Sequence, residues 1–178
     1  MASFVPIRRL DHFAYRCRDA EETRRFYEDL LGLPLIHVIR QDRVPSTQEF
    51  APHAHIFFRM TDGSCIAFFD LGDNEAAAPS PNTPAWVNHL ALRVDSEAAL
   101  ATALEKLRGA GIEVLGPTDH GFIKSIYFFD PNGIRLELSA PASGLKPETT
   151  EGHARSAHAE LAEWDRAKRA RHGVAAPR

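Results

Sequence analysis

An internal repeat limits what this chain can fold into more than any other feature of its sequence. The segment HFAYRCRD, which begins at His12, and the segment HLALRVD, which begins at His89, both alternate His, Ala and Arg with mostly apolar residues. His89 follows His12 by 77 residues, and Gly133 of a later hairpin follows Gly63 of an earlier one by 70 residues. Self-similarity of this kind indicates that one supersecondary unit occurs twice.

Each copy predicts one strand, one helix and three further strands. Runs that alternate apolar and polar residues, or that are rich in β-branched and aromatic residues, predict strands. These strands are expected at 9–18, 35–40, 55–60 and 65–71 in the first copy and at 87–95, 113–115, 125–130 and 133–139 in the second. The interval 41–52, with two prolines and several polar residues, predicts a loop, and 73–84 predicts a linker.

The helices carry start signals of their own. Asp19 followed by Glu22 forms a capping box, and a second helix is expected at 96–109. The predicted fold class is therefore α+β, with two tandem βαβββ modules. Module 1 spans about 7–72 and module 2 about 86–140, so that 7–140 makes one domain.

The remaining segment, 141–178, is predicted to be a C-terminal extension. Its apolar and amphipathic residues recur at a spacing of three or four, which predicts a helix over 154–171. We expect this helix to lie on the domain surface or to contact a second subunit. The expected assembly is a homo-oligomer, with the dimer as its simplest form.

Composition excludes several classes of partner. A formal net charge of −3 gives no basic surface for nucleic acid or for anionic lipid. No apolar run is long enough to span a bilayer, and the first residues lack the pattern of a signal peptide, so a cytoplasmic location is expected. Cys17 and Cys65 both lie in apolar strand-like runs, where buried free thiols are expected.

Two histidines and a carboxylate form the first candidate site. His12 and His89 occupy equivalent places on equivalent strands, and Glu137 lies on the last strand of module 2. A pair of modules related by a pseudo-twofold axis brings such positions to a shared centre. Two imidazoles and one carboxylate with open positions suit non-haem iron(II). Three protein ligands and water equally suit a catalytic zinc.

The stretch TDHGFIKSIYFFDPNGIRLE at 118–137 supplies the second set of candidates. It places His120, Tyr127 and Glu137 along two candidate strands joined by the turn DPNG. Together with the repeat, these motifs resemble the vicinal oxygen chelate superfamily, which contains glyoxalases, bleomycin-resistance proteins and extradiol dioxygenases. The resemblance covers about 7–140. It implies modules whose strands curl as one mixed sheet, like a barrel, around a divalent metal held by His12, His89 and Glu137.

Within that superfamily the sequence is most similar to type I extradiol dioxygenases. Aligning the two hairpin glycines puts Ala67 opposite Glu137, so the fourth ligand of glyoxalase I and methylmalonyl-CoA epimerase is missing. The resemblance implies iron(II), a small aromatic diol and dioxygen as substrates, and catalytic and substrate-binding roles for His120 and Tyr127. Manganese, zinc, nickel and cobalt are alternative metals.

One position departs from the extradiol pattern. Ser64 stands where that family places a further histidine, and His55 on the preceding strand is the candidate substrate-binding residue that could take its place. Two other functions stay open on the sequence. One is a glyoxalase-like or epimerase-like metal-dependent isomerase or lyase, and the other is a non-catalytic protein that binds a small molecule such as a drug.

Overall fold

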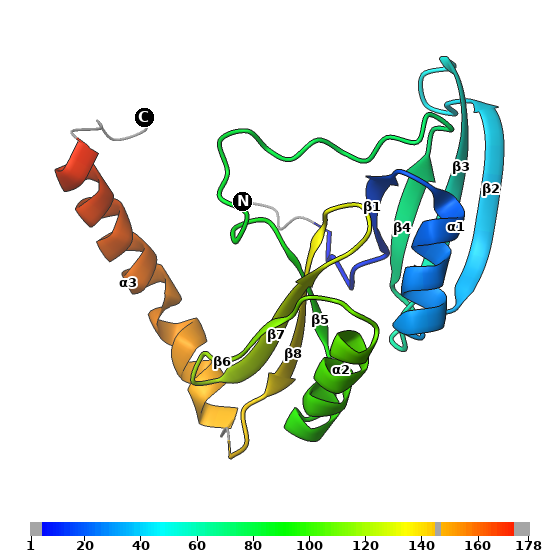
Figure 1. Cartoon of the computed structure of the whole chain (residues 1–178). Helices are drawn as coiled ribbons and strands as arrows, with labels where there is room; N and C mark the ends of the chain where they lie inside the picture. The colour runs from blue at the N-terminus through cyan, green and yellow to red at the C-terminus, as the bar shows by residue number, and fades with distance from the viewer. Residues whose placement is uncertain (1–4, 145–146, 173–178) are drawn as a thin grey trace.

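Residues 5–144 and 147–172 are described by a computed structural model of the chain, in which two β-sheets each carry helices on one side (Figure 1). Module 1 consists of β1 (His12–Cys17), α1 (Ala20–Arg24), its π-helical continuation η1 (Arg25–Leu30), β2 (Leu35–Arg43), β3 (Phe50–Arg59) and β4 (Cys65–Asp70). Module 2 consists of β5 (Leu90–Arg93), α2 (Glu97–Gly109), β6 (Leu115–Asp119), β7 (Ile123–Phe129) and β8 (Arg135–Pro141). A long helix, α3 (Pro147–His172), follows.

The two modules have the same topology. Module 1 forms a four-stranded sheet in the order β1-β4-β3-β2, and module 2 forms one in the order β5-β8-β7-β6. In each sheet the first strand of the module pairs in parallel with the last, and the other pairs are antiparallel. The predicted α+β class and the tandem βαβββ modules are therefore confirmed. The eight strands hydrogen-bond as two sheets, each closed within its own module.

The predicted helix starts are confirmed by their caps. The side chain of Asp19 accepts a hydrogen bond from the backbone N–H of Glu22 at 2.6 Å, and Ser96 accepts one from Ala99 at 3.1 Å. These bonds satisfy backbone donors that have no partner inside the helix. The first helix ends where Gly32 takes a φ of 78°, a left-handed conformation that costs glycine little.

Two predicted boundaries were wrong. The expected loop at 41–52 is mostly strand, because β2 and β3 continue to pair beyond a register shift and place Arg43 opposite Phe50. The shift is a bulge, and a bulge tolerates the missing donor of Pro52. The strand expected at 113–115 instead occupies Leu115–Asp119, at the edge of its sheet, where Pro117 is also tolerated.

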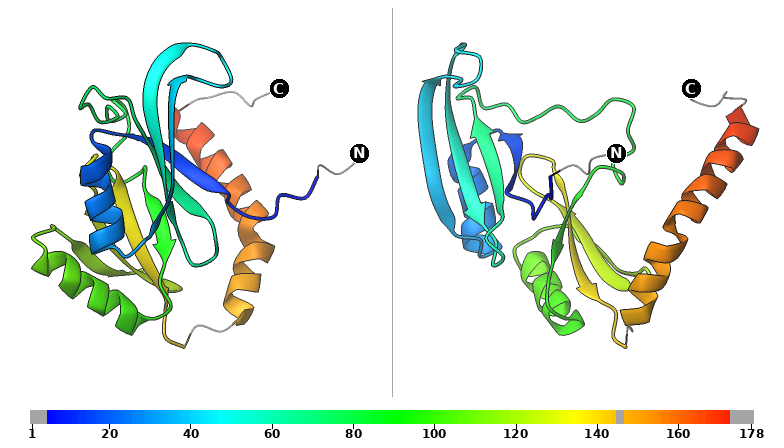
Figure 2. Two further views of the ribbon diagram at one scale, coloured as in Figure 1. Left: turned by 90° about the vertical axis from the view of Figure 1, so that its right-hand side faces the viewer. Right: turned by 180° about the vertical axis from the view of Figure 1, so that it is seen from behind.

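The modules meet on the sides of their sheets that carry the helices (Figure 2). The hydroxyl of Tyr27 in η1 donates a buried hydrogen bond of 3.0 Å to Asp130 in the β7–β8 turn. Phe26 lies with its ring centre 6.3 Å from that of Phe128, and one apolar cluster runs through both modules. This junction leaves the opposite sides of the two sheets without helices. We call them the open faces.

The C-terminal helix is longer than predicted. It runs beside the β6–β7 turn, where the ring of Phe122 lies 5.6 Å from that of His153, and then extends away from both sheets (Figure 1). Leu161 and Trp164 are exposed on it. Within the described part of the chain, none of the helices has the length and apolar character needed to cross a membrane.

The two cysteines are free and buried, as predicted. Cys17 is fully buried in the shared core, and burial raises the pKa of its thiol to about 11. At neutral pH the thiol is therefore protonated, and a protonated thiol is a poor nucleophile. Cys17 is a packing residue.

Candidate functional site

The open face of module 2 brings together one histidine and one carboxylate. Glu137 lies on β8, between β5 and β7, and its neighbours across the ladders are Ala91 and Tyr127. His89 immediately precedes β5, and its Nε2 atom lies 3.1 Å from Oε2 of Glu137. The parallel pairing of the first and last strands of the module makes this approach possible, because it aligns the start of β5 with the start of β8.

Glu137 is held in place from a second direction. The residue is 4% exposed, and the hydroxyl of Ser125 on β7 donates a hydrogen bond of 2.5 Å to its Oε1. A buried carboxylate without partners is costly. The two oxygens of Glu137 are therefore divided, with Oε1 bound by Ser125 and Oε2 directed at His89.

The other ring nitrogen of His89 fixes its orientation. Nδ1 lies 2.9 Å from the backbone carbonyl of Val87, and a carbonyl can only accept. The ring therefore carries its proton on Nδ1, and in the neutral tautomer Nε2 presents a lone pair to Glu137. Two acceptors then face each other, an arrangement that a shared cation satisfies. A histidine whose far nitrogen donates to a carbonyl is the usual form of a metal ligand.

His120 and Tyr127 form a second pair on the same face. His120 lies in the turn between β6 and β7 rather than on a strand, and its Nε2 atom is 2.8 Å from the hydroxyl of Tyr127. The ring of Tyr127 lies 6.2 Å from that of His89, edge to face. The guanidinium of Arg135 lies 4.5 Å from the centre of the Tyr127 ring. Four of the six predicted site residues, His89, His120, Tyr127 and Glu137, therefore lie together on module 2.

The environment of Tyr127 keeps its phenol protonated. Partial burial raises the pKa of Tyr127 above its usual value, and the nearby carboxylate of Glu137 raises it further. A protonated phenol beside an imidazole can donate a hydrogen bond to one oxygen of a ligand, while the imidazole exchanges a proton. This pair has the composition of an acid–base group.

The other two predicted residues lie on the open face of module 1. His12 begins β1, and its ring centre lies 6.0 Å from that of His55 on β3 and 5.5 Å from that of Phe57. Nδ1 of His12 lies 2.8 Å from a carboxylate oxygen of Asp11, so its Nε2 atom presents a lone pair in the same way as that of His89.

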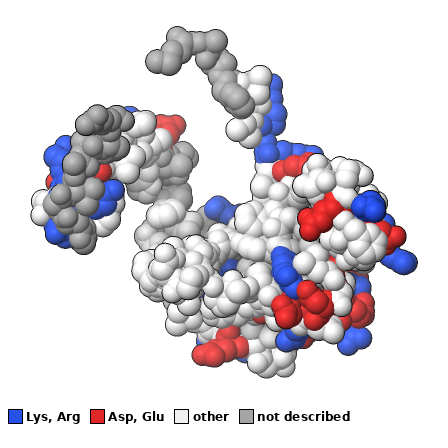
Figure 3. Space-filling view, turned by 90° about the horizontal axis from the view of Figure 1, so that it is seen from above, with Lys and Arg blue, Asp and Glu red and all other residues white. Residues whose placement is uncertain are grey.

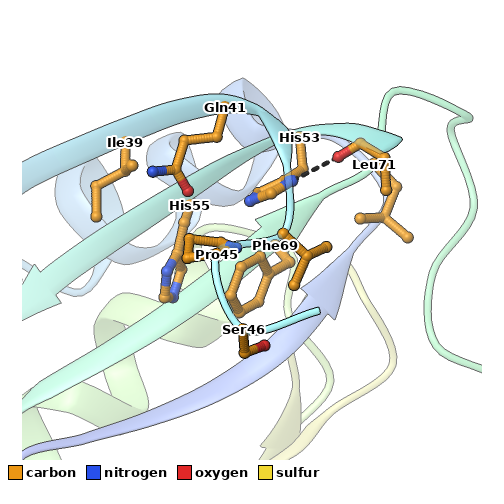
Figure 4. A pocket seen from close by; sticks show the side chains of 10 residues that line it. Ile39, Gln41, Pro45, Ser46, His53, His55, Phe69 and Leu71 are labelled. Carbon is orange, nitrogen blue, oxygen red and sulfur yellow. Dashed lines mark hydrogen bonds between the residues drawn. The ribbon is translucent and has the colours of Figure 1, made fainter. Parts of the chain in front are cut away.

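His55 lines a pocket of about 410 Å³ on module 1. Its ring stacks on that of Phe69 at 3.7 Å, beside His53 and Leu71 (Figure 4). Burial lowers the pKa of His55 to about 4, and the neighbouring histidines lower it further, so the ring is neutral at pH 7. Its Nε2 atom is buried and has no hydrogen-bond partner among the described residues. The full lining is Ile39, Gln41, Val44, Pro45, Ser46, Ala51, His53, His55, Phe69 and Leu71.

One chain does not bring the three predicted metal ligands together. His89 and Glu137 meet on module 2, whereas His12 belongs to the histidine cluster of module 1. Across residues 5–144 and 147–172, no three His, Cys, Asp or Glu side chains gather closely enough to hold a metal ion. The donor chemistry of the three residues suits a divalent metal, but their arrangement within one chain does not.

Ser64, which stands in the place expected for a further histidine, is a turn residue. It is 1% exposed, and its hydroxyl donates a hydrogen bond of 2.6 Å to the side chain of Asp62. The side chain is therefore occupied within the β3–β4 turn. The sequence analysis missed Ser125, although a serine two residues before Tyr127 on one strand shares its face.

The duplicated modules and the polar open faces define a paired βαβββ protein, and comparison with known proteins gives its family. The model of the Glyoxalase/Bleomycin resistance protein/Dioxygenase superfamily matches residues 9–138. The chain belongs to this superfamily, as the resemblance in the sequence predicted.

A curated relative is biphenyl-2,3-diol 1,2-dioxygenase 2 of Rhodococcus globerulus. It is 30% identical over 105 residues, which are 54% of this chain and 55% of that protein. The chain therefore matches about half the length of this relative.

Solved structures share the fold. A glyoxalase/dioxygenase from Nostoc punctiforme has a TM-score of 0.57 at 22% identity, over 80% of this chain and 100% of that one. A variant of the fosfomycin resistance protein FosX from Listeria monocytogenes, solved with manganese(II), has a TM-score of 0.57 at 19% identity, over 78% and 96% of the two chains. A glyoxalase/bleomycin resistance protein/dioxygenase from Nocardioides has a TM-score of 0.54 at 26% identity, over 81% and 90%. Identities near 20% support the shared fold.

Proposed function

We propose that this protein is a non-haem iron(II)-dependent dioxygenase that opens a catechol-type ring beside its two adjacent hydroxyl groups. The observation that carries the proposal is the His120–Tyr127 pair, bonded at 2.8 Å on the same sheet face as His89 and Glu137. An acid–base pair next to a metal-ligand pair is what a diol substrate requires, because one of its hydroxyl groups must lose a proton as it binds. The similarity to the Rhodococcus biphenyl-2,3-diol dioxygenase supports the same substrate class.

Each residue of the pair has a separate task in this proposal. Tyr127, whose pKa is raised by burial, stays protonated and donates a hydrogen bond to one substrate oxygen. His120 takes the proton that the diol releases, since an imidazole accepts and returns protons near neutral pH. Arg135 lies against the Tyr127 ring and limits the positions that the ring can take. Glu137, held by Ser125, supplies the negative charge of the site.

The module 1 pocket fits the ring of such a substrate. Its walls combine the stacked rings of His55 and Phe69 with the aliphatic side chains of Ile39 and Leu71. A volume of about 410 Å³ lies within the range of small-molecule sites. The neutral ring of His55 could hydrogen-bond a polar group of the ligand through its unpartnered Nε2 atom.

The test is oxygen uptake on a panel of diols. Protein loaded with iron(II) without oxygen is mixed with catechol, substituted catechols or biphenyl-2,3-diol and then exposed to air. We expect oxygen consumption together with a yellow ring-fission product. Parallel samples loaded with manganese, zinc, nickel or cobalt identify the active metal. Tight diol binding without oxygen uptake under every metal would contradict the proposal.

A further inference from the structure

The two sets of groups that a working site needs lie on different modules of one chain. Module 2 holds the pair His89 and Glu137, and module 1 holds His12. Both histidines nevertheless have the form of metal ligands, since each Nδ1 atom bonds an oxygen and each Nε2 atom is left for another partner. His12 is therefore prepared for a site that its own chain does not complete.

The contact between the modules explains why. Tyr27 and Phe26 of module 1 pack against Asp130 and Phe128 of module 2 on the sides of the sheets that carry the helices. Asn132 adds hydrogen bonds to this junction by accepting from the backbone of Arg18 at 2.9 Å. A junction built on the helix sides leaves both open faces unpaired.

The surface area of the chain indicates that a large partner is missing. The chain exposes 12501 Å², whereas a compact monomer of 19.8 kDa exposes about 8,600 Å². The excess of about 3,900 Å² is more than enough for an obligate dimer, in which each partner covers about 1,000–2,500 Å².

Exposed apolar residues adjoin both halves of the predicted metal site. Ile7 and Leu10 precede His12 and are 85% and 48% exposed, and Trp86 precedes His89 and is 68% exposed. Seen from above, charged side chains gather over module 1 and over α3, while the middle of this face is largely uncharged (Figure 3). Apolar side chains of this size favour an interface over solvent.

We propose that two copies of this chain complete each other's metal site, with His12 of each copy joining His89 and Glu137 of the other. The inference rests on the metal dependence in the proposed function. A twofold dimer suits it, because an isologous interface makes the same contact twice and so yields two equivalent sites. The same pairing puts the module 1 pocket of one copy against the His120–Tyr127 pair of the other, so that the substrate wall and the acid–base group form one site.

Complementation between two inactive variants tests the proposal. His12→Ala removes the module 1 ligand, and Glu137→Gln removes a module 2 ligand while it preserves the shape of the buried side chain. The two variants, carrying different tags, are co-expressed and the mixed dimer is purified through both tags. Each homodimer should lose its iron(II) after anaerobic loading and desalting. The mixed dimer should retain about half the iron per chain of the wild-type protein, because one of its two sites is intact.

A site within one chain predicts the opposite result, since each chain of the mixed dimer then lacks a ligand and no iron is retained. That result, or a monomer in sedimentation analysis, would overturn the inference. If Glu137→Gln does not fold, His89→Ala replaces it, because that side chain is 34% exposed. The matched control pairs His158→Ala with wild-type protein, since His158 lies exposed on α3 and should leave the iron content unchanged.

Iron content and ring cleavage separate the two proposals. Restored iron without oxygen uptake on any diol would contradict the dioxygenase and leave the shared site standing. Wild-type iron retention and activity with no restoration in the mixed dimer would contradict the shared site alone.

Discussion

The Nε2 atom of His120 lies 2.8 Å from the hydroxyl oxygen of Tyr127, which joins the β6–β7 turn to the middle of β7. The two residues are close in sequence, but the bond depends on the β6–β7 hairpin, which brings the turn back over the open face. Tyr127 also stands opposite Glu137 in the β7–β8 ladder. One bond therefore connects the proposed proton carrier with the proposed metal ligands.

Loss of either member of this pair should slow turnover without removing the metal. Tyr127→Phe deletes one hydrogen bond to a charged substrate, so we expect kcat to fall about 10- to 100-fold. His120→Gln removes the proton acceptor, and a loss of about 100-fold or more is expected. Oxygen uptake and iron content are measured on the same samples. Tyr15→Phe, in the half-buried ring of module 1, serves as the control, and equal activity of Tyr127→Phe would show that its hydroxyl only packs.

Removal of Glu137 should release the metal. Glu137→Ala deletes a ligand, whereas Ser125→Ala deletes only the 2.5 Å bond that orients it. We expect Ser125→Ala to weaken iron binding about 10- to 100-fold and Glu137→Ala to weaken it more. Metal analysis after equilibrium dialysis gives both values. Glu105→Ala on α2 is the matched control, because that acidic side chain is exposed. Unchanged iron content in Glu137→Ala would show that the metal is held elsewhere.

Sequence reasoning reached the modules because local patterns encode them. Alternation exposes His12 and His89 on one side of a strand, and the capping residues Asp19 and Ser96 announce their helices within a few positions. The strands at 41–52 were missed because their pairing depends on a bulge, and two prolines conceal it.

The arrangement of the modules could not be predicted in the same way. The bond between Tyr27 and Asp130 joins residues 103 positions apart. A pseudo-twofold axis in the sequence requires equivalent positions, but it does not say whether they meet within one chain or between two. The candidate site was therefore predicted residue by residue, and its division between His12 and the His89–Glu137 pair appeared only in three dimensions.

The same long-range bond can be tested by its effect on stability. Tyr27→Phe keeps the ring, which is fully buried, and removes the hydroxyl that donates to Asp130 at 3.0 Å. We expect the free energy of unfolding to fall by about 1–3 kcal/mol, the usual effect of losing a buried hydrogen bond to a carboxylate. Urea denaturation followed by circular dichroism gives this value. Tyr15→Phe should have a smaller effect, and equal effects would remove the special role of the junction.

The acid limb of stability should depend on Glu97. Its carboxylate accepts a hydrogen bond from Nζ of Lys124 at 2.7 Å and another from the backbone of Ser143 at 2.7 Å, tying α2 to β7 and to the chain after β8. The bond from Lys124, and next that from Ser143, lower the pKa of Glu97 to about 2. Because the folded-state pKa lies below the unfolded value, this group stabilises the fold above about pH 4.5, and the contribution is lost as the pH falls through 2.

Glu97→Gln should therefore lower the urea midpoint at pH 7, and the difference from wild type should shrink as the pH falls from 4.5 and vanish near 2. Glu105→Gln, an exposed acid on the same helix, is the control and should show little difference at any pH. The measurement is a series of urea titrations between pH 7 and pH 2. A difference that stays constant across the series would mean that Glu97 acts through packing of its side chain, because only an interaction of the ionised carboxylate disappears on protonation.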